Sequence, residues 1–187
     1  ALQMARRPLL LGRHQLVLDL SRVEVTQYLF EKLDALLGEY PVSYLKWDMN
    51  RDLATAALEG GHGGRAAYRQ QNLALYRLLA RVREAHPGVE VESCSSGGAR
   101  PDAGILRHTH STWLSDEVKP RESVQLGYGC TVEFAPEVCN HWMVGDTNRG
   151  DIQPGAESGW WDFMLRVPMN GQYGISSKVF EWSPELK

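Results

Sequence analysis

Val42-Ser43-Tyr44-Leu45-Lys46-Trp47-Asp48 reads as a β-strand, and the sequence that follows it decides the fold. A helix is expected from about residue 66 to residue 86, because apolar residues recur there at helical spacing until Pro87-Gly88 ends the pattern. Residues 89–94 then read as a second strand. A strand, a helix and another strand predict two parallel strands with the helix packed outside them.

The same alternation continues on both sides of this unit. A capping box at residues 21–24 predicts a helix over residues 25–36, and further helices are expected at residues 102–107, 122–127 and 160–167. The other strands are expected at residues 16–20, 111–116 and 171–176, with 131–134 as a weaker candidate and 142–144 as its rival. Six strands in 187 residues indicate an α/β fold, an incomplete TIM-type (β/α)8 barrel with about the last six β/α units, because a complete barrel needs about 250 residues.

The composition excludes several classes of protein. Twenty basic against 23 acidic residues give a formal charge of −3, which lacks the basic surplus of a nucleic-acid-binding domain. No apolar run approaches the roughly 20 residues that span a bilayer, so no membrane partner is expected. Three cysteines suit a reducing compartment better than a disulfide scaffold, and a cytoplasmic location is therefore expected.

Residues at the carboxyl ends of the predicted strands are the first candidates for chemistry, since the active sites of such barrels lie there. Asp48 and Asp116 end strands that are two apart in the predicted order. A glycosidase needs two carboxylates on either side of one bond, one as nucleophile or base and the other as acid. Taken singly, each aspartate is better explained by a helix cap or a salt bridge.

The residues around Asp48 favour the catalytic interpretation. Alternation along a strand sends Lys46 and Asp48 to the same face, and a nearby lysine favours the ionised acid that a nucleophile requires. Trp47 points the other way and is expected to pack against helices. Trp113 and Trp142 are better candidates for stacking against a sugar ring, with core packing as the alternative for both.

Three motifs resemble those of the α-galactosidases of glycoside hydrolase family 36. Residues 46–51, Lys-Trp-Asp-Met-Asn-Arg, resemble the nucleophile motif of the family. Residues 92–102 resemble its loop rich in cysteine and glycine, and residues 112–116 resemble the segment that carries its acid/base aspartate. The order and spacing of the motifs also fit, and residues 13–19 look like the stretch just upstream in the family.

The resemblance implies a role for each matching residue. Asp48 would be the nucleophile that forms a covalent galactosyl-enzyme, and Asp116 would act first as general acid and then as general base. Retention of the anomeric configuration would place the two carboxyl groups about 5–5.5 Å apart. The resemblance implies that the substrate-binding residues include Arg13, Lys46, Cys94, Ser96 and Gly97. Asn50 and Trp113 are further candidates for binding the substrate.

The expected substrates are oligosaccharides with terminal α-D-galactosyl residues, of the melibiose and raffinose type. Neither a cofactor nor a metal ion is expected, and the histidines at positions 108, 110 and 141 lack the paired spacing of a zinc site. An α-N-acetylgalactosaminidase or a transgalactosylase of the same superfamily is the alternative within this interpretation. Members of the family are often homo-oligomers, so the resemblance implies that the enzyme from which this chain derives can also form a homo-oligomer.

The chain also departs from the family pattern. Glu117 follows Asp116 where the family usually has an asparagine, and Pro101 stands where an aromatic residue is more common. Residues 1–187 are expected to be one partial catalytic barrel domain, without the N-terminal β-domain, the first barrel strands and the C-terminal β-domain of the family. A non-catalytic, truncated barrel fragment is therefore a second hypothesis.

Overall fold

The computed structural model describes residues 14–51, 53, 65–145, 158–182 and 184. They belong to two compact units, and each unit is described by itself. The first unit comprises residues 1–95 and 102–110, and the second comprises residues 96–101 and 111–187. Over the described residues, no helix combines the length and the apolar character needed to cross a membrane.

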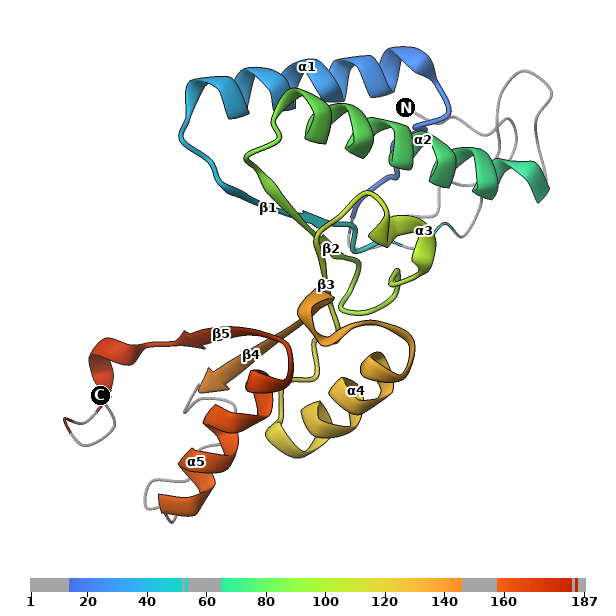
Figure 1. Ribbon diagram of the computed structural model, residues 1–187. Helices are drawn as coiled ribbons and strands as arrows, with labels where there is room; N and C mark the ends of the chain where they lie inside the picture. The colour runs from blue at the N-terminus through green and yellow to red at the C-terminus, as the bar shows by residue number, and fades with distance from the viewer. Residues whose placement is uncertain (1–13, 52, 54–64, 146–157, 183, 185–187) are drawn as a thin grey trace. The chain divides into compact units, whose positions relative to one another are not determined.

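The first unit is built from two parallel strands and their helices (Figure 1). Helix α1 (Val23–Glu39) precedes strand β1 (Tyr44–Asp48), and helix α2 (Arg65–Ala85) connects β1 to strand β2 (Glu90–Cys94). The short helix α3 (Ala103–Leu106) follows. Strands β1 and β2 pair in parallel from Tyr44 opposite Glu90 to Asp48 opposite Cys94, so the predicted strand, helix and strand are confirmed.

The core of the first unit lies between the two strands and the two long helices, which run side by side over one face of the strands (Figure 1). Leu37 of α1 and Leu78 of α2 pack together there, with Val89 just before β2. A second cluster joins α2 and β2 to α3. Trp47 packs against both clusters, which confirms that its ring faces the helices and not the solvent side of β1.

The second unit continues the parallel pattern with three strands. Strand β3 (Ser111–Trp113) leads into helix α4 (Pro120–Glu133), the short helix η1 (Pro136–Val138) and strand β4 (Cys139–Gly145). Helix α5 (Ser158–Arg166) and the short helix η3 (Val167–Asn170) then precede strand β5 (Gln172–Ser177) and the short helix η4 (Val179–Glu181). Strand β4 pairs in parallel with both β3 and β5.

Helices α4 and α5 lie on the same side of β4 and β5 (Figure 1). Alternate residues of β4 explain this arrangement, because His141 meets α4 at Gly127 and Met143 packs against Met164 of α5. A Cβ atom on Gly127 would lie 2.7 Å from Nε2 of His141, so the ring requires a glycine at this place in the helix.

The prediction of a strand at residues 16–20 was wrong, and so was the capping box at residues 21–24. The backbone of residues 16–20 bonds to a helix side chain and not to a neighbouring strand at two positions. Gln71 of α2 donates to Leu18 O and accepts from Leu20 N, both at 2.9 Å. Helix α1 begins after Arg22 with no side-chain cap, because Ser21 bonds to Asp19 instead. The described residues thus contain five strands in place of the six expected.

Residues 131–134 were also assigned wrongly as a strand candidate. They lie in and just after the last turn of α4, which begins with Pro120 at its first position and runs past the predicted end at residue 127. The rival segment 142–144 is part of β4, so that alternative is confirmed.

The cysteines differ from the expectation based on their number. Cys130 of α4 and Cys139 of β4 form a disulfide, whereas Cys94 is a free, buried thiol. The number of cysteines did not predict this disulfide. Cys130 and Cys139 are nine residues apart in sequence, and the chain between them turns from α4 into β4 and brings their sulfur atoms together.

Candidate active site

Strand β1 presents Lys46 and Asp48 on its exposed face. The residues between and before them, Leu45 and Trp47, are half-buried toward the helices. This alternation confirms that the lysine and the aspartate share one face of the strand. Asp48 is the last residue of β1, which places a carboxylate at the carboxyl end of a parallel strand.

The segment after β1 holds Asp48 in place. The side-chain amide of Asn50 donates to Oδ2 of Asp48 at 2.5 Å. Met49 ties the two strand ends together, because its N–H donates to Cys94 O at 3.2 Å and its carbonyl accepts from the Ser95 hydroxyl at 2.7 Å. An amide that donates to a carboxylate fixes the direction in which that carboxylate points.

Glu92 is a charged residue of this face that was not considered as a site residue from the sequence. It lies opposite Lys46 in the parallel register, its side chain is fully buried, and its Oε1 lies 2.9 Å from Nζ of Lys46. The Tyr44 hydroxyl bonds to its other oxygen. Alternation along residues 89–94 could have placed Glu92 on this face, but the register of β1 against β2 was needed to give it Lys46 as a partner.

In the second unit, the glycine loop lies against the segment after β3. Ser96 and Gly97 have φ angles of 45° and 79°, in the left-handed region that favours glycine. A Cβ atom on Gly97 would lie 2.7 Å from Asp116 N, and one on Gly98 would lie within 2.0 Å of Leu114 O. The glycines of the loop are therefore what allow its backbone to approach Asp116 so closely.

Trp113 orients Asp116. Its indole N–H donates to Oδ1 of the aspartate at 2.9 Å, and Asp116 lies in a bend three residues after the end of β3. The ring is only 7% exposed and packs edge-on against Trp142, with ring centres 5.1 Å apart. In this structure Trp113 therefore packs in the core, which was the alternative to stacking against a sugar ring.

Glu117 adds a second carboxylate beside Asp116. The Lys119 N–H donates to its Oε1 at 3.1 Å, and this backbone bond lowers the pKa of Glu117 below its usual value. The lysine ammonium lies 3.5 Å from the other oxygen. Glu117 is therefore ionised at neutral pH, as a fixed negative charge next to the candidate acid.

The candidate residues are divided between the units. Lys46, Asp48, Asn50 and Cys94 lie in the first unit, and Ser96, Gly97, Trp113 and Asp116 lie in the second. Arg13 lies outside the described residues. In the part of the chain that the structure describes, no cluster of three or more His, Cys, Asp or Glu side chains is placed to hold a metal ion.

Comparison with known proteins identifies a family. The Melibiase family model matches residues 1–182. An alpha-galactosidase from Escherichia coli is 46% identical over 127 residues, which cover 68% of this chain and 17% of the relative. Alpha-galactosidase 2 from Pediococcus pentosaceus is 32% identical over 188 residues, covering 98% of this chain and 25% of the relative. The chain thus spans about a quarter or less of the length of these curated relatives.

Solved structures show the same relationship. A variant of the GH36 alpha-galactosidase AgaA from Geobacillus stearothermophilus, in complex with raffinose, has a TM-score of 0.87 and 27% identity to this chain. The similarity covers 98% of this chain and 25% of that structure. AgaB from the same organism also has a TM-score of 0.87, with 28% identity. Together with the alternating strands and helices, this similarity confirms the predicted fold class, an incomplete (β/α)8 barrel.

Proposed function

This chain belongs to the Melibiase family, the α-galactosidases of glycoside hydrolase family 36, and we propose that it carries the catalytic residues of a retaining α-galactosidase. The proposed substrates are oligosaccharides with a terminal α-D-galactosyl residue, of the melibiose and raffinose type. The observation that carries the proposal is the exposed end of β1, where Asp48 shares a face with Lys46 and is held by Asn50.

In the first proposed step, Asp48 attacks the anomeric carbon of the galactosyl residue. The bond between that carbon and the leaving oxygen breaks, and Asp116 gives its proton to the departing oxygen. The product is a covalent galactosyl-enzyme of inverted, β configuration. The amide of Asn50 supports this step because it fixes one carboxylate oxygen and leaves the other to attack.

In the second step, Asp116 acts as the base. It takes a proton from a water molecule, and the water oxygen attacks the anomeric carbon and releases Asp48. Galactose leaves with its original α configuration. The indole N–H of Trp113 supports both roles of Asp116, because it fixes one oxygen while the other exchanges the proton.

The remaining candidates are proposed to bind the sugar. Lys46 and Arg13 are proposed to donate hydrogen bonds to galactose hydroxyls, and Cys94 with the backbone at Ser96 and Gly97 is proposed to line the galactose pocket. The exposed face of β1 supports the role of Lys46, and the close approach of the glycine loop to Asp116 supports that of Gly97.

Hydrolysis of p-nitrophenyl α-D-galactoside tests the proposal. The assay compares this chain with the protein expressed from its complete gene, because the relatives are several times longer. The expected result is hydrolysis by the complete gene product, with little activity on the N-acetylgalactosaminide. Preference for the N-acetylgalactosaminide would contradict the substrate, and inactivity of the complete gene product on both compounds would contradict the function.

A further inference from the structure

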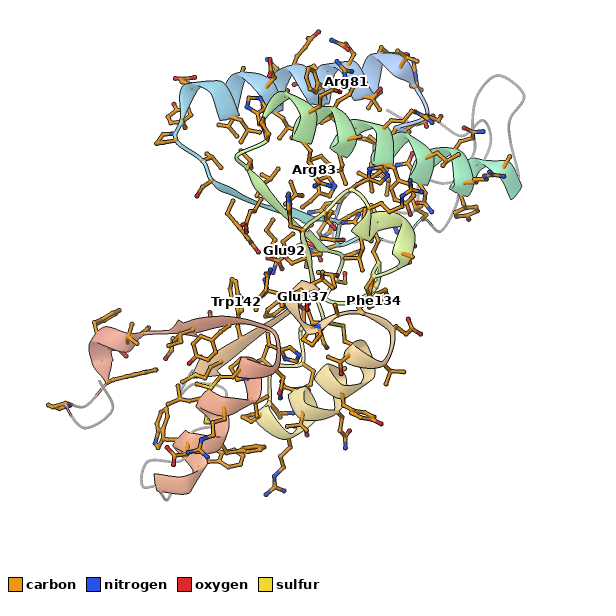
Figure 2. The ribbon with its side chains drawn as sticks, viewed as in Figure 1. Arg81, Arg83, Glu92, Phe134, Glu137 and Trp142 are labelled. Atoms are coloured by element: carbon orange, nitrogen blue, oxygen red, sulfur yellow. A yellow bond between two sulfur atoms is a disulfide. The ribbon has the colours of Figure 1, made fainter. Side chains whose placement is uncertain are left out.

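The buried carboxylate of Glu92 has no part in the two proposed steps, yet it forms an ion pair with Lys46, which is proposed to bind the sugar. We infer that Glu92 is a positioning residue, which holds the ammonium group of Lys46 where it binds a hydroxyl of the galactosyl residue. The inference rests on the proposed function and deepens it, since it assigns a residue that sets the affinity for the sugar. Glu92 is labelled in Figure 2.

Burial separates the roles of the two partners. The side chain of Glu92 is 0% exposed, whereas that of Lys46 is 33% exposed. A ligand at the exposed face of β1 can therefore touch the lysine but cannot reach the glutamate. Glu92 can therefore influence sugar binding only through a neighbouring side chain, and its charged neighbour is Lys46, whose Nζ lies 2.9 Å from Oε1.

Each oxygen of Glu92 lies beside one partner, Oε1 in an ion pair and Oε2 in a hydrogen bond, and these contacts fix the carboxylate in place. The ammonium of Lys46 forms an ion pair with Oε1, and the Tyr44 hydroxyl donates a hydrogen bond to Oε2. Tyr44 and Lys46 are alternate residues of β1, and Glu92 faces them from the neighbouring strand in register. A buried carboxylate that lost such partners would be strongly destabilised, which keeps the pair together.

A lysine benefits from such an anchor more than most residues. Its ammonium sits on a flexible four-carbon stem, and ordering that stem on ligand binding reduces affinity. Pairing with Glu92 orders it in advance. Because the ammonium has three N–H donors, it can hold Glu92 and bind a sugar hydroxyl at the same time.

A double-mutant cycle on the complete gene product tests the inference. Glu92→Gln keeps the shape of the side chain and removes its charge, and Lys46→Met removes the ammonium. Glu92→Gln is expected to raise KM for p-nitrophenyl α-galactoside roughly tenfold, the equivalent of one charge-assisted hydrogen bond, with a smaller effect on kcat. In the Lys46→Met background, Glu92→Gln is expected to add no further increase in KM, because Glu92 acts through Lys46.

Matched variants make the result specific. Glu90→Gln changes the same residue type on the same strand, at an exposed position, and is expected to leave KM unchanged. If Glu92→Gln does not fold, Tyr44→Phe removes the bond to the other carboxylate oxygen and is expected to raise KM less, again with no further increase in the Lys46→Met background.

The outcomes separate the inference from the function on which it rests. Active wild-type protein with additive effects of Glu92→Gln and Lys46→Met on KM would overturn the inference alone. So would a Glu92→Gln variant that melts at a lower temperature but keeps its KM, since that result describes a purely structural residue. Wild-type protein inactive on α-galactosides would overturn the proposed function and the inference with it.

Discussion

At the scale of single residues, Lys46 has a different neighbourhood from the one expected. The sequence suggested a lysine that acts on Asp48 from the same face of a strand. The structure adds Glu92, whose charge offsets that of Lys46. Asp48 is held directly by the Asn50 amide, which donates to one of its oxygens. The electrostatics of the proposed nucleophile therefore depend on a neutral donor as well as on the nearby ion pair.

Removal of the Asp48 carboxylate tests the nucleophile. Asp48→Ala is expected to lower kcat by roughly 10⁴-fold, because no other group forms the glycosyl-enzyme. Added azide is expected to restore turnover and to give β-galactosyl azide, since it attacks from the side that Asp48 occupied. Asp34→Asn, at an exposed pair with His86, is the control and should keep full activity. If Asp48→Ala formed the α-azide, the assignment of Asp48 as the nucleophile would be wrong.

The indole N–H of Trp113 gives a second prediction for a single residue. Trp113→Phe keeps an aromatic ring in the core but removes the donor to Asp116. We expect kcat on raffinose to fall roughly tenfold, the equivalent of one hydrogen bond to a charged group, with KM little changed. Trp182→Phe is the matched control, because it removes an indole bond to Ser177 instead. Equal effects of the two variants on kcat would argue against a role for Trp113 at Asp116.

At the scale of elements, the glycine loop limits what can stand beside Asp116. Gly97→Ala places a methyl group 2.7 Å from Asp116 N at a φ angle of 79°. Activity is expected to fall at least tenfold, and the free energy of unfolding by about 1–2 kcal/mol, because the backbone has to move. Gly88→Ala, with nothing within 4 Å of the new methyl group, should leave the activity unchanged. A fully active Gly97→Ala enzyme would contradict the importance of this approach.

Strand β4 contributes a pH-dependent stability through His141. Burial lowers the pKa of His141 below the ordinary value of 6.5, so the unfolded chain binds a proton more readily than the folded one. The free energy of unfolding is therefore expected to fall as the pH drops below about 6.5, with a limiting slope of about 1.4 kcal/mol per pH unit for one proton. His108 contributes in the same direction, because burial also lowers its pKa.

Urea unfolding at a series of pH values measures this slope. His141→Gln is expected to be less stable than the wild type near neutral pH but to lose less stability on acidification. Met143→Leu, at a buried position of the same strand without a titratable group, is the control and should keep the wild-type slope. An unchanged slope in His141→Gln would show that this residue is not the group that titrates.

Local patterns predicted most of these elements, and the exceptions have a physical cause. Helix α2 and strand β2 were predicted within about a residue, since amphipathic spacing and Pro87-Gly88 mark them in the sequence. Residues 16–20 have the composition of a strand, but Gln71 bonds to their backbone from a helix 51 residues away. Residues 131–133 favour a strand by propensity, yet they extend a helix already begun at Pro120.

At the scale of the whole molecule, three short motifs were enough to predict the family. The chemistry of glycoside hydrolysis requires two carboxylates and their neighbours at strand ends, so these residues are recognisable along the chain. The supporting contacts could not be predicted in the same way. The pairing of Glu92 with Lys46 depends on the strand register, and that of Trp113 with Asp116 on the bend after β3.

The central claim is that Asp48 is the nucleophile of a retaining α-galactosidase, and covalent trapping tests it most directly. The complete gene product is incubated with a fluorinated α-galactosyl fluoride, whose ring fluorine slows the breakdown of the glycosyl-enzyme. Peptide mass spectrometry is expected to find the fluorogalactosyl group on Asp48, in the peptide that contains residues 46–50. Activity without any label, or a label on another carboxylate, would contradict the account.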